Sequence, residues 1–169
     1  MDFTLLSTYI DHRLLIAAGL GAIIGMEREF AGKDPSFRTF ALICLGSCVF
    51  SIISNSLVLP LSPEAAADPF QARYLSDPGR IAAQVVVGIG FLGAGTIFRS
   101  KHGVSGLTTA ALMWVTAAIG MAVGFDKLDL AITGTVTAII ILVVLTWAHK
   151  IVNYIRSRNG EPSPGLPDE

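Results

Sequence analysis

The fold is decided by residues 79–124, which read GRIAAQVVVGIGFLGAGTIFRSKHGVSGLTTAALMWVTAAIGMAVG. Two apolar spans, 81–98 and 106–125, flank a short basic loop, and this pattern predicts a transmembrane hairpin. A bilayer forces such spans to be helical, because unpaired backbone groups in hydrocarbon are costly. We therefore expect an all-α membrane protein built around this hairpin.

The first of these spans carries four glycines, Gly88, Gly90, Gly93 and Gly95. Small residues let a neighbouring backbone approach closely, so the glycines predict a surface for helix packing. Three of them also form the Gly-x-Gly-x-x-Gly pattern of dinucleotide-binding sites. That site requires a preceding strand and a soluble helix, whereas apolar residues flank the pattern here. We favour packing and expect no cofactor.

The composition excludes several other classes of protein. The chain has 169 residues, 52% of them hydrophobic and 15% charged, which is too apolar for a soluble domain of this size. A net charge of −1 gives no basic field for nucleic acid. Cys44 and Cys48 lie in an apolar span as small packing residues, and the three histidines are scattered, so we expect no metal site. No arrangement of residues typical of a catalytic site stands out in the sequence, such as Ser-His-Asp, paired acids or Cys-His, and we expect no enzyme.

Five stretches predict membrane spans, near residues 8–26, 40–59, 81–98, 106–125 and 130–147. Together they predict a polytopic transmembrane helical bundle over residues 1–158, with no large soluble domain. The long connection at 60–80 predicts a short surface helix before the third span. Residues 159–169 are rich in proline and glycine and predict a disordered cytoplasmic tail.

The basic residues are unevenly distributed between the two sides of the predicted bundle. One side holds Arg28, Lys33, Arg38, Arg99, Lys101, Lys150, Arg156 and Arg158, and the other holds Arg13, Arg73, Arg80 and Lys127. The side with the larger number of Lys and Arg is usually cytoplasmic. The N-terminus is therefore predicted outside and the C-terminus inside.

A polar cluster is predicted at the cytoplasmic boundary. Glu27, Arg28 and Glu29 end the first span, and Arg38 and Thr39 begin the second after a short loop. Opposite charges near hydrocarbon seek partners, so we expect Arg38 to pair with Glu27 or Glu29. Simple anchoring by snorkelling arginines is an equally good interpretation of the cluster.

Two further groups of polar residues belong to the central hairpin. The outer end of the third span holds Asp77, Arg80 and Gln84, and the fourth span holds Thr108, Thr109, Thr116 and Trp114. A helix cap at Asp77 and an interfacial anchor at Arg80 explain these two without a ligand. Trp114 is predicted to face the bundle interior or a protein interface, with a bulky core filler as the simpler account.

The sequence contains a series of ordered motifs that together resemble one family. They are GxxxGxERE at 21–29, FRT at 37–39, DPxRIAAQ at 77–84, GIGFLGAG at 88–95 and GLTTAA at 106–111, followed by Trp114 and AAIG at 117–120. This series resembles the MgtC/SapB family. The resemblance implies a multi-pass protein of the bacterial inner membrane, in which the N-terminus predicted outside is periplasmic. It also implies a link to growth in low magnesium, to virulence and to inhibition of the F-type ATP synthase.

We therefore predict a regulatory membrane protein that binds a membrane partner or a second copy of itself in the bilayer. A small-solute or ion transporter or channel is the alternative. A pathway requires polar groups that converge at mid-depth, for which Gln84, Thr108, Thr109 and Thr116 are the available residues. A partner surface instead requires the glycines of residues 88–95 to face outward.

Overall fold

The computed structural model of the protein describes residues 12–57, 79–101 and 103–158. These residues form the helices α2 (His12–Phe30), α3 (Phe37–Ser56), α6 (Gly79–Ala94), α7 (Leu107–Gly124) and α8 (Leu128–Arg158). An antiparallel pair of strands, β1 (Phe98–Ser100) and β2 (Gly103–Ser105), connects α6 to α7. The predicted all-α bundle without a large soluble domain is confirmed for this part of the chain. The predicted surface helix within 60–80 and the tail at 159–169 fall largely or wholly outside the described residues.

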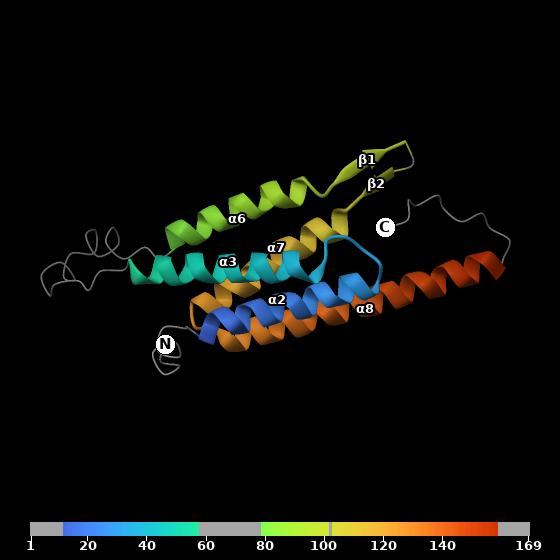
Figure 1. Ribbon diagram of the computed structural model, residues 1–169. Coiled ribbons are helices and arrows are strands. Elements are labelled where there is room, and N and C mark those ends of the chain that lie inside the picture. The colour runs from blue at the N-terminus through green and yellow to red at the C-terminus, as the bar shows by residue number, and fades with distance from the viewer. Residues whose placement is uncertain (1–11, 58–78, 102, 159–169) are drawn as a thin grey trace, which may run out of the picture.

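Helix α3 lies in the middle of the bundle, in contact with α2, α6 and α7 (Figure 1). Helix α8 packs against α7 and α2 on the far side from α6. The hairpin of β1 and β2 and the connection from α2 to α3 share one end, on the right in Figure 1. The turn from α7 to α8 lies at the opposite end. The connections between helices therefore lie at two opposite ends of the bundle.

Three of the described helices are long and apolar enough to cross a membrane: α3, α7 and residues Leu128–Ala148 of α8. Helix α6 is apolar but shorter, with 16 residues. Helices of this length and composition are typical of a membrane protein. That the chain crosses the membrane five times stays a prediction.

Several helix boundaries differ from the predicted spans. Helix α2 continues past residue 26 to Phe30 and so includes the three charged residues at 27–29. The helix predicted at 81–98 ends at Ala94. Phe98 instead pairs with Ser105, so the backbone groups at the end of the predicted span form hydrogen bonds between strands and not within a helix. Helix α8 continues past residue 147 to Arg158, where apolar residues still recur every three or four positions.

Helix α2 approaches α3 through two glycines spaced four residues apart. A Cβ atom on Gly21 would lie 2.7 Å from the Cβ of Cys44, and one on Gly25 would overlap the backbone of Phe37. Glycines at this spacing place their backbones on one helix face, so the two helices can pack in direct contact. The close contact of α2 with α3 thus depends on Gly21 and Gly25.

Helix α7 approaches α3 in the same way. A Cβ atom on Gly120 would overlap the carbonyl oxygen of Cys44, and one on Gly124 would lie 2.6 Å from the carbonyl oxygen of Cys48. Both cysteines are fully buried free thiols. The prediction that Cys44 and Cys48 are small packing residues is confirmed, because a larger side chain would separate α3 from its neighbours.

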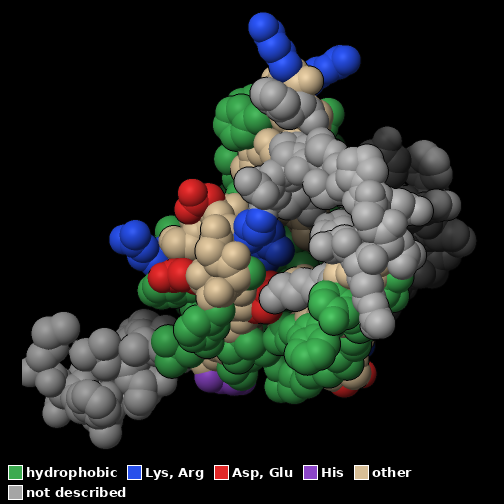
Figure 2. Space-filling view, turned by 90° about the vertical axis from the view of Figure 1, so that its right-hand side faces the viewer, with side chains coloured by type: hydrophobic (Ala, Val, Ile, Leu, Met, Phe, Trp, Pro, Cys, Tyr) green, Lys and Arg blue, Asp and Glu red, His purple; other side chains and the backbone are tan. Residues whose placement is uncertain are grey.

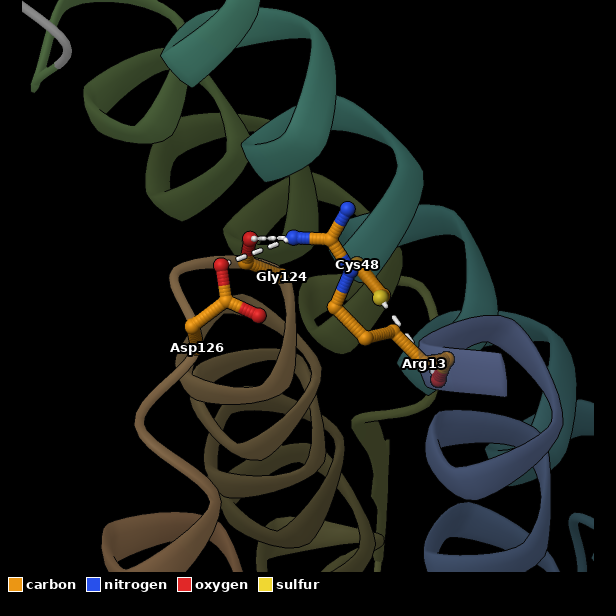
Figure 3. A network of polar contacts seen from close by, with 4 residues as sticks. All are labelled: Arg13, Cys48, Gly124 and Asp126. Atoms are coloured by element: carbon orange, nitrogen blue, oxygen red, sulfur yellow. Dashed lines mark hydrogen bonds and ion pairs between the residues drawn. The ribbon is translucent and has the colours of Figure 1, made fainter. Parts of the chain in front are cut away.

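An ion pair joins the ends of the helices away from the hairpin (Figure 3). Arg13 Nη1, in the first turn of α2, lies 2.9 Å from Asp126 Oδ2 in the turn between α7 and α8. The same nitrogen lies 3.4 Å from the carbonyl oxygen of Gly124, and Cys48 Sγ approaches the carbonyl oxygen of Arg13 at 3.9 Å. This contact, which we did not predict, ties α2, α3 and α7 together at one end.

Candidate functional site

An open groove runs between α3 and α6, with a volume of about 1,010 Å³. Its lining, called the α3–α6 groove below, is mostly apolar and consists of Thr39, Leu42, Ile43, Gly46, Ser47, Phe50, Ile81, Gln84, Val85, Gly88, Ile89, Phe91, Leu92, Ala94, Gly95, Thr96 and Met113. This volume is at the upper limit of the range of small-molecule pockets, about 300–1,000 Å³. The groove is therefore large enough for several bulky side chains of a partner.

The glycines of α6 contribute less to packing within the chain than the sequence suggested. At Gly88 and Gly90, no described atom outside the local helix lies within 4 Å of where a Cβ would be. A Cβ on Gly93 would lie 3.5 Å from Ala110, and one on Gly95 would meet only carbonyl oxygens of its own helix. Gly88, Gly90 and Gly95 therefore do not pack against another described helix of this chain, and their packing against a partner helix stays a prediction. Spacing cannot show which face meets a neighbour, and Gly88 lies about 140° around the helix from Gly93.

The polar residues available for a pathway are separated in the structure. Thr116 is buried in the bundle, and its hydroxyl donates to the carbonyl oxygen of Leu112 in its own helix at 2.8 Å. Thr109 donates instead to the carbonyl oxygen of Asp34, at the hairpin end of the bundle. Gln84 is exposed on the α3–α6 groove. These groups do not converge at mid-depth.

A second, smaller cavity of about 290 Å³ lies at the hairpin end of the bundle. Its lining, called the polar pocket below, consists of Arg28, Gly32, Lys33, Asp34, Ser105, Gly106, Thr108 and Thr109. Figure 2 shows this end of the molecule, where basic and acidic side chains are mixed between hydrophobic flanks. The end of α2 thus meets the start of α7 across a polar cavity.

The predicted ion pair of Arg38 is not formed. Arg38 is exposed, and its side chain has no ion pair or hydrogen bond with any described residue. Glu29 Oε2 instead lies 3.4 Å from the backbone nitrogen of Phe37, at the start of α3. The partial positive charge of a helix N-terminus attracts this carboxylate, and α2 extends far enough to bring it there.

Arg28 is the buried member of the predicted cluster, with 7% of its surface exposed. Its Nε atom and Glu27 Oε2 are buried without a hydrogen-bond partner among the described residues. Sequence reasoning placed Arg28 in the cluster but missed Lys33, Ser105 and Gly106 of the polar pocket. For Gly106, the available signal was a glycine directly before an apolar span.

The remaining predicted residues are dispersed. Arg80 is exposed in the first turn of α6, and Asp77 falls outside the described residues. Thr39 lines the α3–α6 groove rather than the polar pocket. Trp114 is 53% exposed, so the account of it as a core filler is wrong. Its neighbours in α7, Met113 and Val115, are the more buried residues.

The sequence matches the MgtC family over residues 14–151, which is most of the chain. The chain belongs to the MgtC family. Over 148 residues it is 41% identical to YhiD of Escherichia coli K12, whose name describes a candidate magnesium transporter, covering 87% of this chain and 64% of YhiD. Over 142 residues it is 38% identical to the protein MgtC of Salmonella typhimurium LT2, covering 84% of this chain and 54% of that protein. No solved structure matches the chain.

The chain is also 38% identical to a protein of Haemophilus influenzae over 148 residues. This match covers 83% of the chain and 59% of the relative. The chain thus spans about half to two thirds of the length of these curated relatives. Motifs that carry the MgtC resemblance border both cavities. Gly88, Ile89, Phe91, Leu92, Ala94 and Gly95 line the α3–α6 groove, whereas Arg28 and Thr108 line the polar pocket.

Proposed function

We propose that this MgtC-family protein is a regulatory protein of the bacterial inner membrane that binds a transmembrane helix of a partner protein in the α3–α6 groove. The observation that carries the proposal is the open space at Gly88, which lines the groove. Small residues on an exposed helix face allow a second backbone to approach closely, and they add little when they face lipid.

The lining of the groove suits a helix better than a polar solute. Phe50 and Phe91 are exposed beside the glycines, and Leu42 and Leu92 are likewise exposed. Aromatic and aliphatic side chains around a smooth backbone surface provide the van der Waals contacts that drive helix association in bilayers. Gln84 adds a side-chain amide that can hydrogen-bond across the interface.

The transport alternative has less support from the same geometry. A pathway requires polar groups lining a continuous route, and Thr116 and Thr109 already donate to backbone carbonyls at separate depths. Magnesium enters the proposal through the name of the relative YhiD, so growth in low magnesium is the physiological readout. The membrane sector of the F-type ATP synthase is the partner that we propose to test first.

Site-specific photo-crosslinking tests the groove directly. A photoreactive residue at Gln84 should yield a crosslink to a membrane protein in cells grown in low magnesium. The same probe at Ile140, which is exposed on α8, serves as the matched control. Gly88→Leu should abolish the Gln84 crosslink and the growth phenotype without lowering membrane abundance, because the site is open in the single chain.

Three outcomes would contradict the proposal. Equal crosslinking from Gln84 and Ile140 would show that the groove has no preference for a partner. A crosslink only to a second copy of the chain would replace the partner with self-association. Magnesium flux in sealed vesicles of the purified protein, abolished by a substitution in the bundle, would favour transport.

If a crosslinked partner is found, proton pumping by the ATP synthase in vesicles with and without Gly88→Leu tests the named candidate.

A further inference from the structure

The N-terminus of α7 opens into the polar pocket without a cap. Gly106 occupies the N-cap position and provides no side-chain hydrogen bond. The first intrahelical bond joins the Ala110 nitrogen to the Gly106 carbonyl oxygen. The N–H groups of the preceding turn therefore have no partner within the helix, and together they carry a partial positive charge. Thr108 and Thr109 of this turn line the pocket.

Arg28 supplies an independent observation at the same place. Its side chain is more than nine-tenths buried and lines the pocket, and it forms no hydrogen bond or ion pair with any described residue. A guanidinium is always charged and carries five donors. Burial of such a group without an ion pair or hydrogen bond is strongly unfavourable, and a bound anion would provide both.

The other residues of the lining fit an oxyanion. Lys33 adds a second positive charge, and Ser105 adds a hydroxyl donor. Asp34 brings one carboxylate to the rim, where the residue is exposed, while its carbonyl oxygen accepts the Thr109 hydroxyl. Glu27 does not belong to the lining. The side chains of the pocket therefore keep a net positive charge beside the helix N-terminus.

We propose that the polar pocket binds a phosphate group, held by the Arg28 guanidinium, Lys33 and the first turn of α7. Arginine matches phosphate with two parallel hydrogen bonds, and a helix N-terminus presents N–H groups to it. The volume of about 290 Å³ has ample room for a phosphate group and lies near the lower limit of small-molecule pockets, about 300 Å³. The pocket lies where an apolar helix begins, so the group can belong to free phosphate or to a phospholipid headgroup.

Thermal unfolding of the purified full chain in uncharged detergent tests the site. Inorganic phosphate should raise the unfolding midpoint in a saturable way, whereas sodium chloride of the same ionic strength should not. Arg28→Gln should weaken the apparent affinity by about tenfold or more, as loss of charge-assisted hydrogen bonds implies. Lys33→Gln should weaken it less. Arg99→Gln, which removes an exposed charge on β1 outside the pocket, should leave it unchanged.

A second arm distinguishes the two sources of phosphate. The protein is placed in nanodiscs of phosphatidylglycerol or of a phosphate-free glycolipid, and the midpoints are compared for wild type and Arg28→Gln. An Arg28-dependent gain in phosphatidylglycerol alone assigns the site to a headgroup. Saturable stabilisation by inorganic phosphate in the glycolipid discs assigns it to the free anion. Either result supports the shared chemistry.

Absence of an Arg28-dependent gain from both phosphate and phosphatidylglycerol would overturn the proposal. If Arg28→Gln does not fold, Arg28→Lys and Lys33→Gln carry the test. Arg28→Lys keeps the charge and loses the paired hydrogen bonds, so unchanged affinity in both variants would also overturn it. The outcome is separate from that of the groove, because none of these residues lines it.

Discussion

Gly120 marks the closest approach between α7 and α3. A Cβ there would overlap the carbonyl oxygen of Cys44, and backbone cannot rotate away as a flexible side chain can. Gly90, by contrast, has open space around the position of a Cβ. Glycines in this chain therefore have two different roles, one in packing the bundle and one in leaving a surface free.

Gly120→Ala should destabilise the folded protein, whereas Gly90→Ala should not. Overpacking of a tight core typically costs about 1–3 kcal/mol, and an open site should change stability by under about 0.5 kcal/mol. Unfolding of the detergent-solubilised protein by increasing fractions of sodium dodecyl sulfate measures both. Equal loss of stability in the two variants would contradict the assignment of their roles.

Arg38 and Arg99 should be equivalent for stability. Both are exposed and have no ion pair with any described residue. Each change to alanine should therefore alter the free energy of unfolding by under about 0.5 kcal/mol. Membrane abundance and detergent unfolding of Arg38→Ala, Arg99→Ala and the double change Arg38→Ala with Glu29→Ala provide the measurement. A much larger loss of stability for Arg38→Ala than for Arg99→Ala would instead support the predicted ion pair of Arg38.

The identity of a residue predicted whether its side chain is buried better than it predicted which side chain it contacts. Cys44 and Cys48 were correctly predicted to pack, since small apolar residues in a membrane span have few other uses. The pairing of Arg38 was predicted from loop length alone, and loop length does not say that Glu29 reaches the N-terminus of α3 instead. Burial of Arg28 had no signal in its neighbours, because it depends on α7 and the 31–36 connection lying beside it.

Among the elements, the turn from α7 to α8 fixes the end of the bundle away from the hairpin. Asp126 adopts a positive φ of 59° there, a conformation that Asp and Asn tolerate better than most residues. This conformation places its carboxylate against Arg13 of α2. The side chain of Arg13 is 22% exposed and that of Asp126 is 66% exposed, so water screens the pair.

A double-mutant cycle with Arg13→Gln and Asp126→Asn should give a coupling energy of about 0.5–1 kcal/mol, as expected for a partly exposed pair. Asparagine retains the tolerance for positive φ, so the cycle isolates the charge. Lys127→Gln is the control, because this neighbouring charge is exposed and should show no coupling to Arg13. Coupling within error of zero for the Arg13 cycle would show that the contact is structurally unimportant.

Element boundaries were predictable only where composition changes sharply. The span predicted at 106–125 corresponds closely to α7, since glycine precedes it and a charged turn follows. The predicted third span was too long, because apolar residues at 97–98 resemble the end of a helix and belong to β1. The paired strands depend on register between Arg99 and Val104, which hydropathy does not encode.

At the scale of the whole molecule, the two ends of the bundle differ in their basic residues. The hairpin end holds Arg28, Lys33, Arg38 and Arg99, whereas Arg13 and Lys127 lie at the opposite end. The rule that Lys and Arg accumulate in cytoplasmic loops then predicts that the hairpin faces the cytoplasm. The polar pocket would face the cytoplasm as well.

Cysteine labelling in spheroplasts tests this orientation with little background, because the native Cys44 and Cys48 are fully buried. Ser100→Cys on β1 and Leu128→Cys at the start of α8 place thiols at exposed sites on the two ends. Neither change alters the number of Lys or Arg, so the charge bias that sets the orientation is preserved. A membrane-impermeant maleimide should label the cysteine at 128 in intact spheroplasts and the cysteine at 100 only after permeabilisation. The reverse pattern would place the hairpin and the polar pocket outside, and labelling of both in intact spheroplasts would mean that the chain inserts in two orientations.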